Sequence, residues 1–297
     1  MRGYIVNPHQ AYCTQRRMPR AMAQARFRRN WETIARLANR HTLSVQSWLS
    51  SRSPQAARLD GIGVTATSTG LPVPFLNLAL GSQFPPGTQE RVIEEEVQAV
   101  KAFFARRGVP FMWLLSPFAS PPNMGKRLKE HGLSQAQYRL PLMVAPLNSP
   151  PTYPAPPSQV YSWQAQSRAD LQAASTIRRI AFRFKPGTAL TYFEDMAEDW
   201  LLGDPARLFL AHAEEGAPPA AIGACIMAAG VPGIYVMATL PAWGRRGLGK
   251  AVLARILSEA KEEGHALIVL TASAQGYPLY RKFGFEHIFE YEVYRMP

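Results

Sequence analysis

A short segment rich in glycine and arginine is the part of this sequence best suited to chemistry. Residues 241–250 read Pro-Ala-Trp-Gly-Arg-Arg-Gly-Leu-Gly-Lys and lie between a run with strand character and a run with helix character. Glycine lets the backbone approach a ligand closely and adopt positive φ at little cost. The free amides at the start of the following helix would point at an anion, which the helix dipole would also favour. Because Arg245, Arg246 and Lys250 add positive charge, the segment predicts a pyrophosphate site.

Two common nucleotide-binding motifs do not explain this segment. Gly244 to Lys250 has the spacing of a P-loop, but Ala251 follows where a magnesium-binding serine or threonine is needed. The glycines at 244, 247 and 249 are in the wrong order for a Rossmann fingerprint, and no acidic residue ends a strand about 20 residues later.

The segment instead resembles the coenzyme A pyrophosphate loop of the GCN5-related N-acetyltransferase (GNAT) family. That loop has the motif Gln/Arg-x-x-Gly-x-Gly/Ala, usually after a strand that ends in Val-x-Pro. Thr239-Leu240-Pro241 matches the strand end, and Gly244 stands where the motif has Gln or Arg, so the neighbouring arginines would supply the missing charge. The resemblance implies that the loop residues holding coenzyme A are Arg245, Arg246, Gly247, Leu248, Gly249 and Lys250.

A second family element lies downstream. GNAT enzymes often carry Asn-x-x-Ala-x-x-Leu-Tyr-x-x-x-Gly-Phe, and here the run begins at Ser273, with Ser273 and Gly276 in place of Asn and Ala. The other four positions match, as Leu279, Tyr280, Gly284 and Phe285. With both elements about 30 residues apart, the resemblance covers roughly residues 165–297.

The resemblance implies transfer of an acetyl group from acetyl-CoA to an amine, by direct attack of the amine on the thioester in a ternary complex. Backbone groups of Met237, Ala238 and Thr239 would pair with the pantetheine arm, and one amide there would stabilise the oxyanion. Ser273 would also lie in the cofactor site. Tyr280 would protonate the leaving thiolate as general acid. Taken without the motif, Tyr280 is better explained as a buried tyrosine that packs a short helix, and the motif shifts the balance to the acid.

No side chain stands out as the base that takes the proton from the amine, and no set of residues indicates a metal. The strand at 234–240 contains no carboxylate or histidine. A cluster of acidic residues lies on a predicted helix where the acceptor cleft of the family often begins, although such clusters are more often solvated helix faces; it comprises Glu194, Asp195, Glu198 and Asp199. Proton loss through ordered water is an equal alternative. The acceptor amine is not encoded in any motif, and a non-catalytic acyl-CoA-binding or regulatory module is the alternative function.

The second half of the sequence predicts the elements that would position these residues. Helical patterns occupy residues 168–183, 190–202 and the stretch after Lys250, which ends at Gly264. Apolar runs predict strands at 207–213, 220–228, 234–240 and 267–270. A short helix at 275–282 and one or two strands at 285–296 complete the order.

The first half gives a weaker version of the same order. Helices are expected at 30–40, 42–50, 89–106 and 125–131, and strands at 62–68, 75–80, 110–115 and 140–145. Both halves end with a helix, a glycine, an apolar residue and a strand, which indicates an internal duplication. The first half has no glycine-rich turn after its strand at 75–80 and is not expected to bind a cofactor.

We therefore expect an α/β (α+β) fold with two GNAT-like domains, each a mixed, mostly antiparallel central sheet flanked by helices. Five prolines in residues 148–158 predict a stiff, extended linker. The predicted organisation is a basic N-terminal arm at 1–25, a degenerate GNAT-like domain at 26–147, this linker, and a GNAT acetyltransferase domain at 159–297.

Composition limits the partners. Of the 297 residues, 33 are basic and 21 acidic, a net charge of +12 that lies wholly within residues 1–150. A basic run attracts nucleic acid, anionic lipid or acidic protein, but without interleaved aromatic residues a solvated arm or an oligomer contact is favoured. No stretch approaches the ~20 apolar residues of a membrane helix. Two cysteines exclude a disulfide framework, which fits the cytoplasm. Neither nucleic acid nor membrane is an expected partner, and a homodimer is left open.

Overall fold

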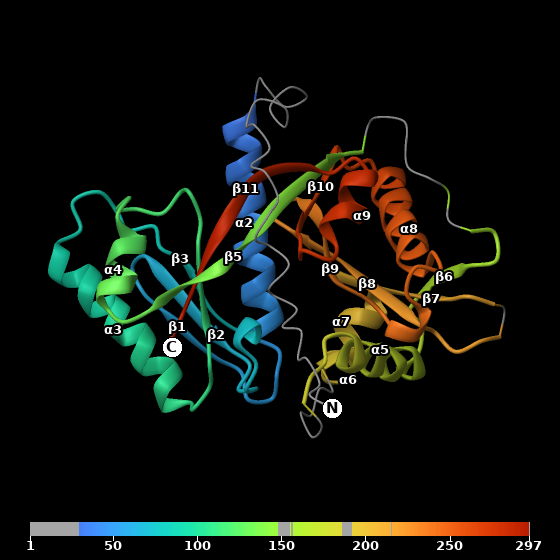
Figure 1. Cartoon of the computed structure of the whole chain (residues 1–297), viewed down its shortest axis with the longest axis horizontal. Coiled ribbons are helices and arrows are strands. Elements are labelled where there is room, and N and C mark those ends of the chain that lie inside the picture. The colour runs from blue at the N-terminus through green and yellow to red at the C-terminus, as the bar shows by residue number, and fades with distance from the viewer. Residues whose placement is uncertain (1–29, 148–154, 156, 186–191, 215, 297) are drawn as a thin grey trace, which may run out of the picture.

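The computed structural model describes residues 30–147, 155, 157–185, 192–214 and 216–296. Its strands form one 11-stranded sheet with the order β1-β2-β3-β4-β11-β5-β10-β9-β8-β7-β6 (Figure 1). The first half contributes α2 (Trp31–Ser50), β1 (Ala57–Asp60), β2 (Val64–Ser68), a 3-10 turn η2 (Pro74–Leu76), β3 (Asn77–Gly81), α3 (Glu90–Arg106), β4 (Met112–Leu115), α4 (Met124–Glu130) and β5 (Ser134–Pro146). The second half contributes β6 (Tyr161–Gln164), α5 (Arg168–Ala181), α6 (Tyr192–Asp195), α7 (Ala197–Leu202), β7 (Ala206–His212), β8 (Ala221–Ala228), β9 (Val231–Thr239), η3 (Pro241–Trp243), α8 (Leu248–Glu262), β10 (Leu267–Thr271), α9 (Tyr277–Lys282) and β11 (Glu286–Arg295).

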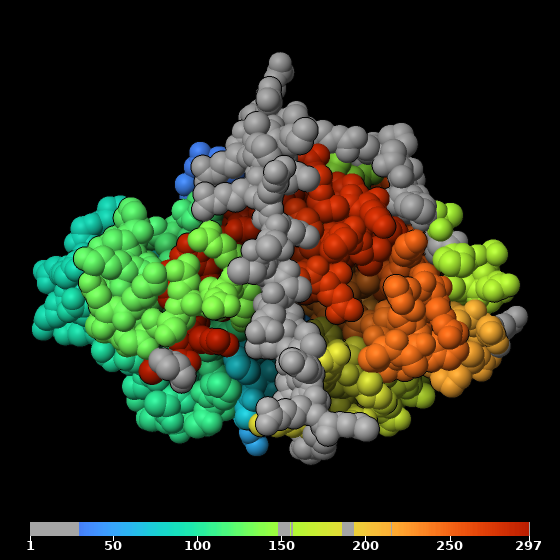
Figure 2. Space-filling view, viewed as in Figure 1, coloured from blue at the N-terminus to red at the C-terminus, as the bar shows by residue number. Residues whose placement is uncertain are grey.

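The two halves exchange their last strands. β5 closes the first half in sequence but pairs antiparallel with β10 of the second half. β11 closes the second half but pairs antiparallel with β4 of the first half. β5 and β11 lie side by side as an antiparallel pair at the centre of the molecule, and in Figure 1 they cross between the two lobes. Figure 2 shows red C-terminal residues at the surface of the green and cyan lobe. The two expected sheets are therefore joined into one.

Helices cover both faces of this sheet. Successive residues of β7 alternate between two cores, since Phe209 packs with α8 and α9, whereas Leu208 and Leu210 pack with α5, α6 and α7. This alternation follows from the two-residue period of a strand. On the first-half side, α3 and α4 pack on one face of the sheet. The middle of α2 packs on the other face, against residues of β3, β4, β5, β10 and β11.

α2 also ties the two halves together. The C-terminal end of α2 enters the core of the second half, where Val45 is buried and the ring of Trp48 contacts that of Trp200 edge-on at 5.8 Å. Earlier in α2, His41 Nδ1 lies 3.0 Å from the carbonyl oxygen of Ala228 at the end of β8. Its ring stacks on Tyr235 of β9 at 5.8 Å. A first-half helix therefore buttresses the strands on which the second-half site is built.

Most elements predicted from the sequence are present, with three differences. The expected helices at 30–40 and 42–50 form one continuous helix, α2. The expected helix at 190–202 is divided into α6 and α7 within its described part. Strands β1 and β6 were not predicted, because each has only four residues and no fully buried face. The arm at 1–25 and most of the linker lie outside the described residues, so the domain boundaries stay a prediction.

Among the described helices, none is both long enough and apolar enough to span a membrane.

Candidate acyl-CoA site

The pair of parallel strands β9 and β10 opens along its length. Their pairing is limited to Gly233 with Val269 and Ile234 with Leu270, at the start of β9. Beyond Ile234, β9 continues to Thr239 paired only with β8 on its other edge, as far as the described residues show. One edge of this strand is therefore available to a ligand chain.

A β-bulge interrupts the pairing of β9 with β8 in the stretch that no longer pairs with β10. Between the pairs Ala224–Tyr235 and Ile222–Ala238, two residues of β9 face one residue of β8, Gly223. Val236 in the bulge has φ of 52°, which a β-branched residue rarely adopts and which costs about 1–3 kcal/mol. A Cβ on Gly223 would lie 2.3 Å from the Met237 sulfur and 2.7 Å from Cγ1 of Val252, so a larger residue would have to displace these side chains. Such bulges redirect strands next to active sites.

The glycine-rich turn lies between this strand and α8, as the sequence predicts. After η3, Gly247 is the N-cap of α8 with φ of 90°, a left-handed conformation that favours glycine. The first helical bond of α8 is donated by the amide of Ala251 to the Gly247 carbonyl. The amides of Leu248, Gly249 and Lys250 thus have no acceptor within the helix and face outward from its N-terminus. These amides are the donor set that an anion requires.

Two glycines of this turn lie close to neighbouring residues, and a Cβ at either position would contact them. A Cβ on Gly247 would lie 2.6 Å from ring atoms of Pro157, a described residue of the linker. A Cβ on Gly249 would lie 3.4 Å from the Thr239 hydroxyl oxygen, an ordinary contact. The backbone of β9 and the start of α8 therefore approach each other closely, which brings the predicted residues 237–239 and 245–250 together.

The turn carries three cations, Arg245, Arg246 and Lys250. Arg245 and Arg246 are exposed and Lys250 is half-buried. Among the described residues none of the three forms an ion pair with a carboxylate. The Arg246 guanidinium instead lies over the ring of Trp243, 4.8 Å from its centroid. Charge, amides and glycines together fit a pyrophosphate, so the residues present fit the cofactor that the sequence implies.

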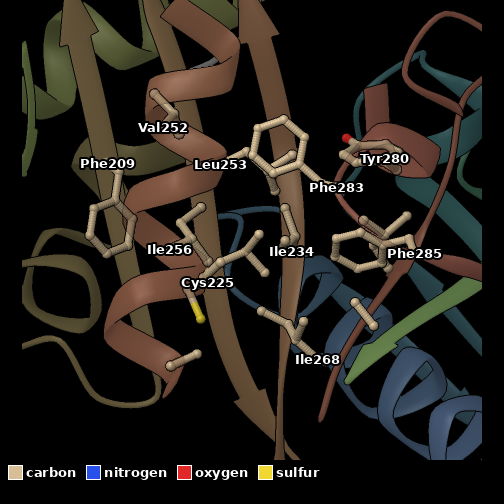
Figure 3. Packing of buried hydrophobic residues seen from close by; sticks show 14 of the residues in the cluster. Phe209, Cys225, Ile234, Val252, Leu253, Ile256, Ile268, Tyr280, Phe283 and Phe285 are labelled. Carbon is tan, nitrogen blue, oxygen red and sulfur yellow. The ribbon is translucent and has the colours of Figure 1, made fainter. Parts of the chain in front are cut away.

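Tyr280 lies in the same hydrophobic cluster as β9 and α8. It is buried and its ring contacts Phe285 edge-on at 5.8 Å. Figure 3 shows the rings of Tyr280, Phe283 and Phe285 gathered near Ile234, with the Tyr280 hydroxyl directed away from Phe285. Burial raises the pKa of Tyr280 above its ordinary value, so the hydroxyl keeps its proton.

Ser273 and Gly276 form the entry to α9. The Ser273 hydroxyl accepts a hydrogen bond from the Gly276 amide at 3.1 Å. A Cβ on Gly276 would lie 2.7 Å from the Tyr280 ring, so the departure from alanine makes room for that ring. Ser273 is exposed, and its place in the cofactor site stays a prediction.

The acidic cluster has mainly structural contacts. The Glu194 carboxylate accepts a hydrogen bond from the Ser175 hydroxyl of α5. Asp199 lies 3.5 Å from the Arg52 guanidinium at the end of α2. Asp195 and Glu198 are exposed. These positions do not identify a base.

The corresponding region of the first half is closed. β3 and β4 are also parallel, but β3 has no bulge against β2. Past the end of β3, Gln83 forms a parallel bridge to Ser120. The Phe84 amide donates to the Ser120 carbonyl, and the Ser120 amide donates to the Ser82 carbonyl. The opening that β9 and β10 leave is thus filled by backbone hydrogen bonds in the first half.

The family assignment follows from the second half. Residues 174–285 match the Acetyltransferase (GNAT) family. The chain carries a GNAT domain. The matched stretch runs from the middle of α5 to the residue before β11, so it includes the bulged strand, the turn and Tyr280.

Solved structures extend the likeness to both halves. A GCN5-related N-acetyltransferase from Kribbella flavida superposes with a TM-score of 0.66 at 22% identity, over 89% of this chain and 95% of that chain. A tandem GNAT protein from the clavulanic acid biosynthesis pathway superposes with a TM-score of 0.60 at 12% identity, over 92% and 95%. The fold is therefore that of a tandem GNAT protein. No curated protein matches the sequence significantly.

Three residues around the GNAT site were not predicted from the sequence. Gly223 and Val236 belong to apolar runs that predict only strands, and the bulge that joins them depends on register. Pro157 belongs to the linker, where composition predicts extension but not the element that it contacts.

Proposed function

We propose that this protein is an N-acetyltransferase that moves an acetyl group from acetyl-CoA to an amine in the GNAT domain. The observation that carries the proposal is the glycine turn at the start of α8 beside the bulged, open edge of β9. GNAT proteins generally use acetyl-CoA. Acetyl-CoA supplies the activated acyl group, and residues of the chain bind it, stabilise the oxyanion and transfer the proton.

Residues at the start of α8 would bind one part of the cofactor, and residues at the open edge of β9 would bind another. The amides of Leu248, Gly249 and Lys250 and the cations of the turn hold the pyrophosphate. The edge of β9 over Met237, Ala238 and Thr239 aligns the pantetheine arm, and one amide there stabilises the oxyanion. Holding both reactants in one opening supplies much of the rate through proximity.

Tyr280 acts as general acid in this proposal. The C–N bond forms as the C–S bond breaks, and the Tyr280 hydroxyl gives its proton to the thiolate. The proton lost by the amine nitrogen restores the tyrosine, so the reaction balances without a co-reactant. Support comes from the match of Tyr280 to the family element at 273–285 and from its place in the same cluster as residues of β9 and α8.

We further propose that the first half binds no acyl-CoA. The bridge between Gln83 and Ser120 occupies the place where the second half opens. The first half instead supplies β5 and α2 as supports. The use of acetyl-CoA and the free, buried thiol of Cys225 favour the cytoplasm.

A thiol-release assay with acetyl-CoA and a panel of amines tests the proposal. We expect at least one amine to release free thiol, and Tyr280→Phe to slow release about 100-fold or more without weakening coenzyme A binding by calorimetry. Tyr277→Phe, on the same helix and half-exposed, is the matched control and should retain the rate. Binding of acetyl-CoA with no release for any amine would instead establish a non-catalytic acyl-CoA-binding module. Equal loss of binding and rate in Tyr280→Phe would assign that residue to packing.

A further inference from the structure

A cavity of about 480 Å³ lies in the first half of the molecule, between the C-terminal part of α2 and the sheet. Its volume is that of a small-molecule site, which in proteins spans about 300–1,000 Å³. Among the described residues, all that line it belong to α2 and its C-cap or to strands β1, β2 and β3. The cavity is therefore separate from the matched GNAT stretch, which begins at residue 174.

The floor of the cavity is a polar stretch of the sheet. Asp60, Thr65 and Leu80 form one cross-strand row over β1, β2 and β3. Because side chains alternate between the two faces of a strand, Val64 and Ala66 pack in the core under α3, whereas Thr65 lines the cavity. The Thr65 hydroxyl donates a hydrogen bond to the Asp60 carboxylate at 3.1 Å. Polar groups thus occupy a face that a structural core would fill with apolar side chains.

The side of α2 that faces this floor carries a row of hydroxyls. Ser44, Ser47 and Ser51 recur at the three- and four-residue spacing of one helix face, and all three line the cavity. Trp48 adds an aromatic surface to the same lining. Its ring contacts the buried ring of Trp200 edge-on at 5.8 Å, which holds it in place. The cavity therefore combines a fixed aromatic ring with hydroxyls on both of its walls.

The second half covers the corresponding face of its sheet completely. By the symmetry of the strand order, β7 and β8 correspond to β1 and β2. β7 and β8 present apolar side chains to α5, α6 and α7, and Phe193 and Trp200 of these helices fill the space. In the first half, α2 leads within a few residues into β1, without a counterpart of α6 and α7. The cavity thus lies on a face that the second half covers with helices.

The charged groups at the cavity balance each other. Arg58 lines the cavity, and its Nε donates to both oxygens of the Asp60 carboxylate at 2.8 Å. Nη1 of Arg58 donates to the Ser47 hydroxyl at 3.1 Å. An anionic or cationic ligand would find no uncompensated partner in this pair. A neutral ligand would instead exchange hydrogen bonds with the serine and threonine hydroxyls, each of which both donates and accepts.

We infer that this cavity binds a neutral, polyhydroxylated molecule of about monosaccharide size. Hydroxyls of the ligand pair with Ser44, Ser47 and Thr65, and its C–H groups pack on the ring of Trp48. The inference goes beyond the proposed acetyl transfer, because such a ligand carries no amine and binds in the half that is proposed to bind no acyl-CoA. The first half is then a binding module as well as a support for the GNAT domain.

Ligand-observed NMR and calorimetry with D-glucose, D-galactose and D-mannose test this inference in the full chain. We expect at least one of these hexoses to bind with a Kd of about 0.1–1 mM, which is ordinary for a ligand of this size. The uronate of the same hexose, which carries a carboxylate at C6, should bind at least about 10-fold more weakly, because its charge has no free partner.

Three variants locate the binding. Ser44→Leu changes an exposed residue of α2 and places an apolar side chain in the cavity, so binding should weaken at least about 10-fold. Thr33→Leu is the matched control, because Thr33 is exposed on the same helix and does not line the cavity. Its affinity should stay within about 2-fold. Thr65→Val removes one hydroxyl and should weaken binding about 3- to 10-fold. Thermal unfolding shows whether each variant is folded.

Failure of all three hexoses to bind at about 10 mM would overturn the inference. Tighter binding of the uronate, or equal affinities in Ser44→Leu and Thr33→Leu, would overturn it as well. These outcomes are distinct from a failure of the proposed function. Coenzyme A should bind Ser44→Leu and the unaltered protein equally, and thiol release from acetyl-CoA is measured without any hexose.

Discussion

Tyr294, near the end of the chain, lies directly opposite Trp113 in the antiparallel pairing of β11 with β4. Both side chains are buried, and Tyr294 packs in the core of the first half although it belongs to the second. The two lobes are therefore connected by strands as well as by the linker. The exchange of β5 and β11 makes each lobe incomplete without the other.

We predict that the two halves unfold together. Tyr294→Leu should lower the free energy of unfolding by about 2–4 kcal/mol, because it removes a buried ring and the hydrogen bond from its hydroxyl to Glu292 at 2.8 Å. The loss should appear equally in amide hydrogen exchange of β2–β3 and of β7–β8. Leu202→Ala, at a side chain that is 81% exposed, is the control and should have little effect. Loss of protection confined to the first half would contradict this prediction.

We predict that acid weakens the contact between α2 and β9 through His41. Burial lowers the pKa of His41 below its usual 6.5, outweighing the backbone hydrogen bonds that raise it. The unfolded chain then binds more protons than the folded one, so stability falls as the pH drops below about 6.5. His41→Gln should flatten the dependence of unfolding free energy on pH between about 5 and 7.

The pKa of His287 is also lowered by burial, so it contributes a slope of the same sign. His287→Gln therefore serves as the comparison. It should remove only the part of the pH dependence of the unfolding free energy that His287 contributes. If the slope of His41→Gln equals that of the unaltered protein, the assignment to His41 is wrong.

The two glycines of the turn should respond differently to alanine. Gly247→Ala places a Cβ in a left-handed residue and against Pro157, which should cost about 1–3 kcal/mol and weaken coenzyme A binding at least about 10-fold. Gly249→Ala meets only the Thr239 hydroxyl at 3.4 Å, and alanine favours the helix. It should keep both stability and binding. Denaturant titration and calorimetry measure the contrast, and equal effects of the two variants would argue against the cradle.

Glu96 stabilises the first hairpin of the first half. Its carboxylate accepts hydrogen bonds from the amides of Ile62, Gly63 and Val64, at 2.9, 2.9 and 2.6 Å. Glu96→Gln should cost about 2 kcal/mol, because an amide nitrogen would then face a backbone donor. Glu95→Gln, in an exposed ion pair with Arg91, should cost under about 0.5 kcal/mol. Similar costs for the two variants in chemical denaturation would refute the role of Glu96.

Local pattern predicted the elements of the second half well. The apolar run at 220–228 predicted a strand, and the residues of β8 from Ala221 to Ile226 are all buried. α8 starts at Leu248, earlier than the predicted start after Lys250, because Gly247 takes the N-cap position in a backbone conformation that few other residues adopt. The four-residue strands β1 and β6 were missed, since so short a run carries too few residues for a period.

The sequence by itself determined the order of helices and strands, the glycine turn with its cations, and the duplication that links the halves. Each depends on residues close together in the chain, whose conformational preferences and spacing are local properties. Only the tertiary structure decided that β5 and β11 change places, that Gly223 accommodates the bulge at Val236, and that Pro157 and α2 support the site. These features depend on which strand edges meet and in which register. Because the two halves end in similar strands, the sequence alone does not say whether each final strand pairs within its own half or with the other half.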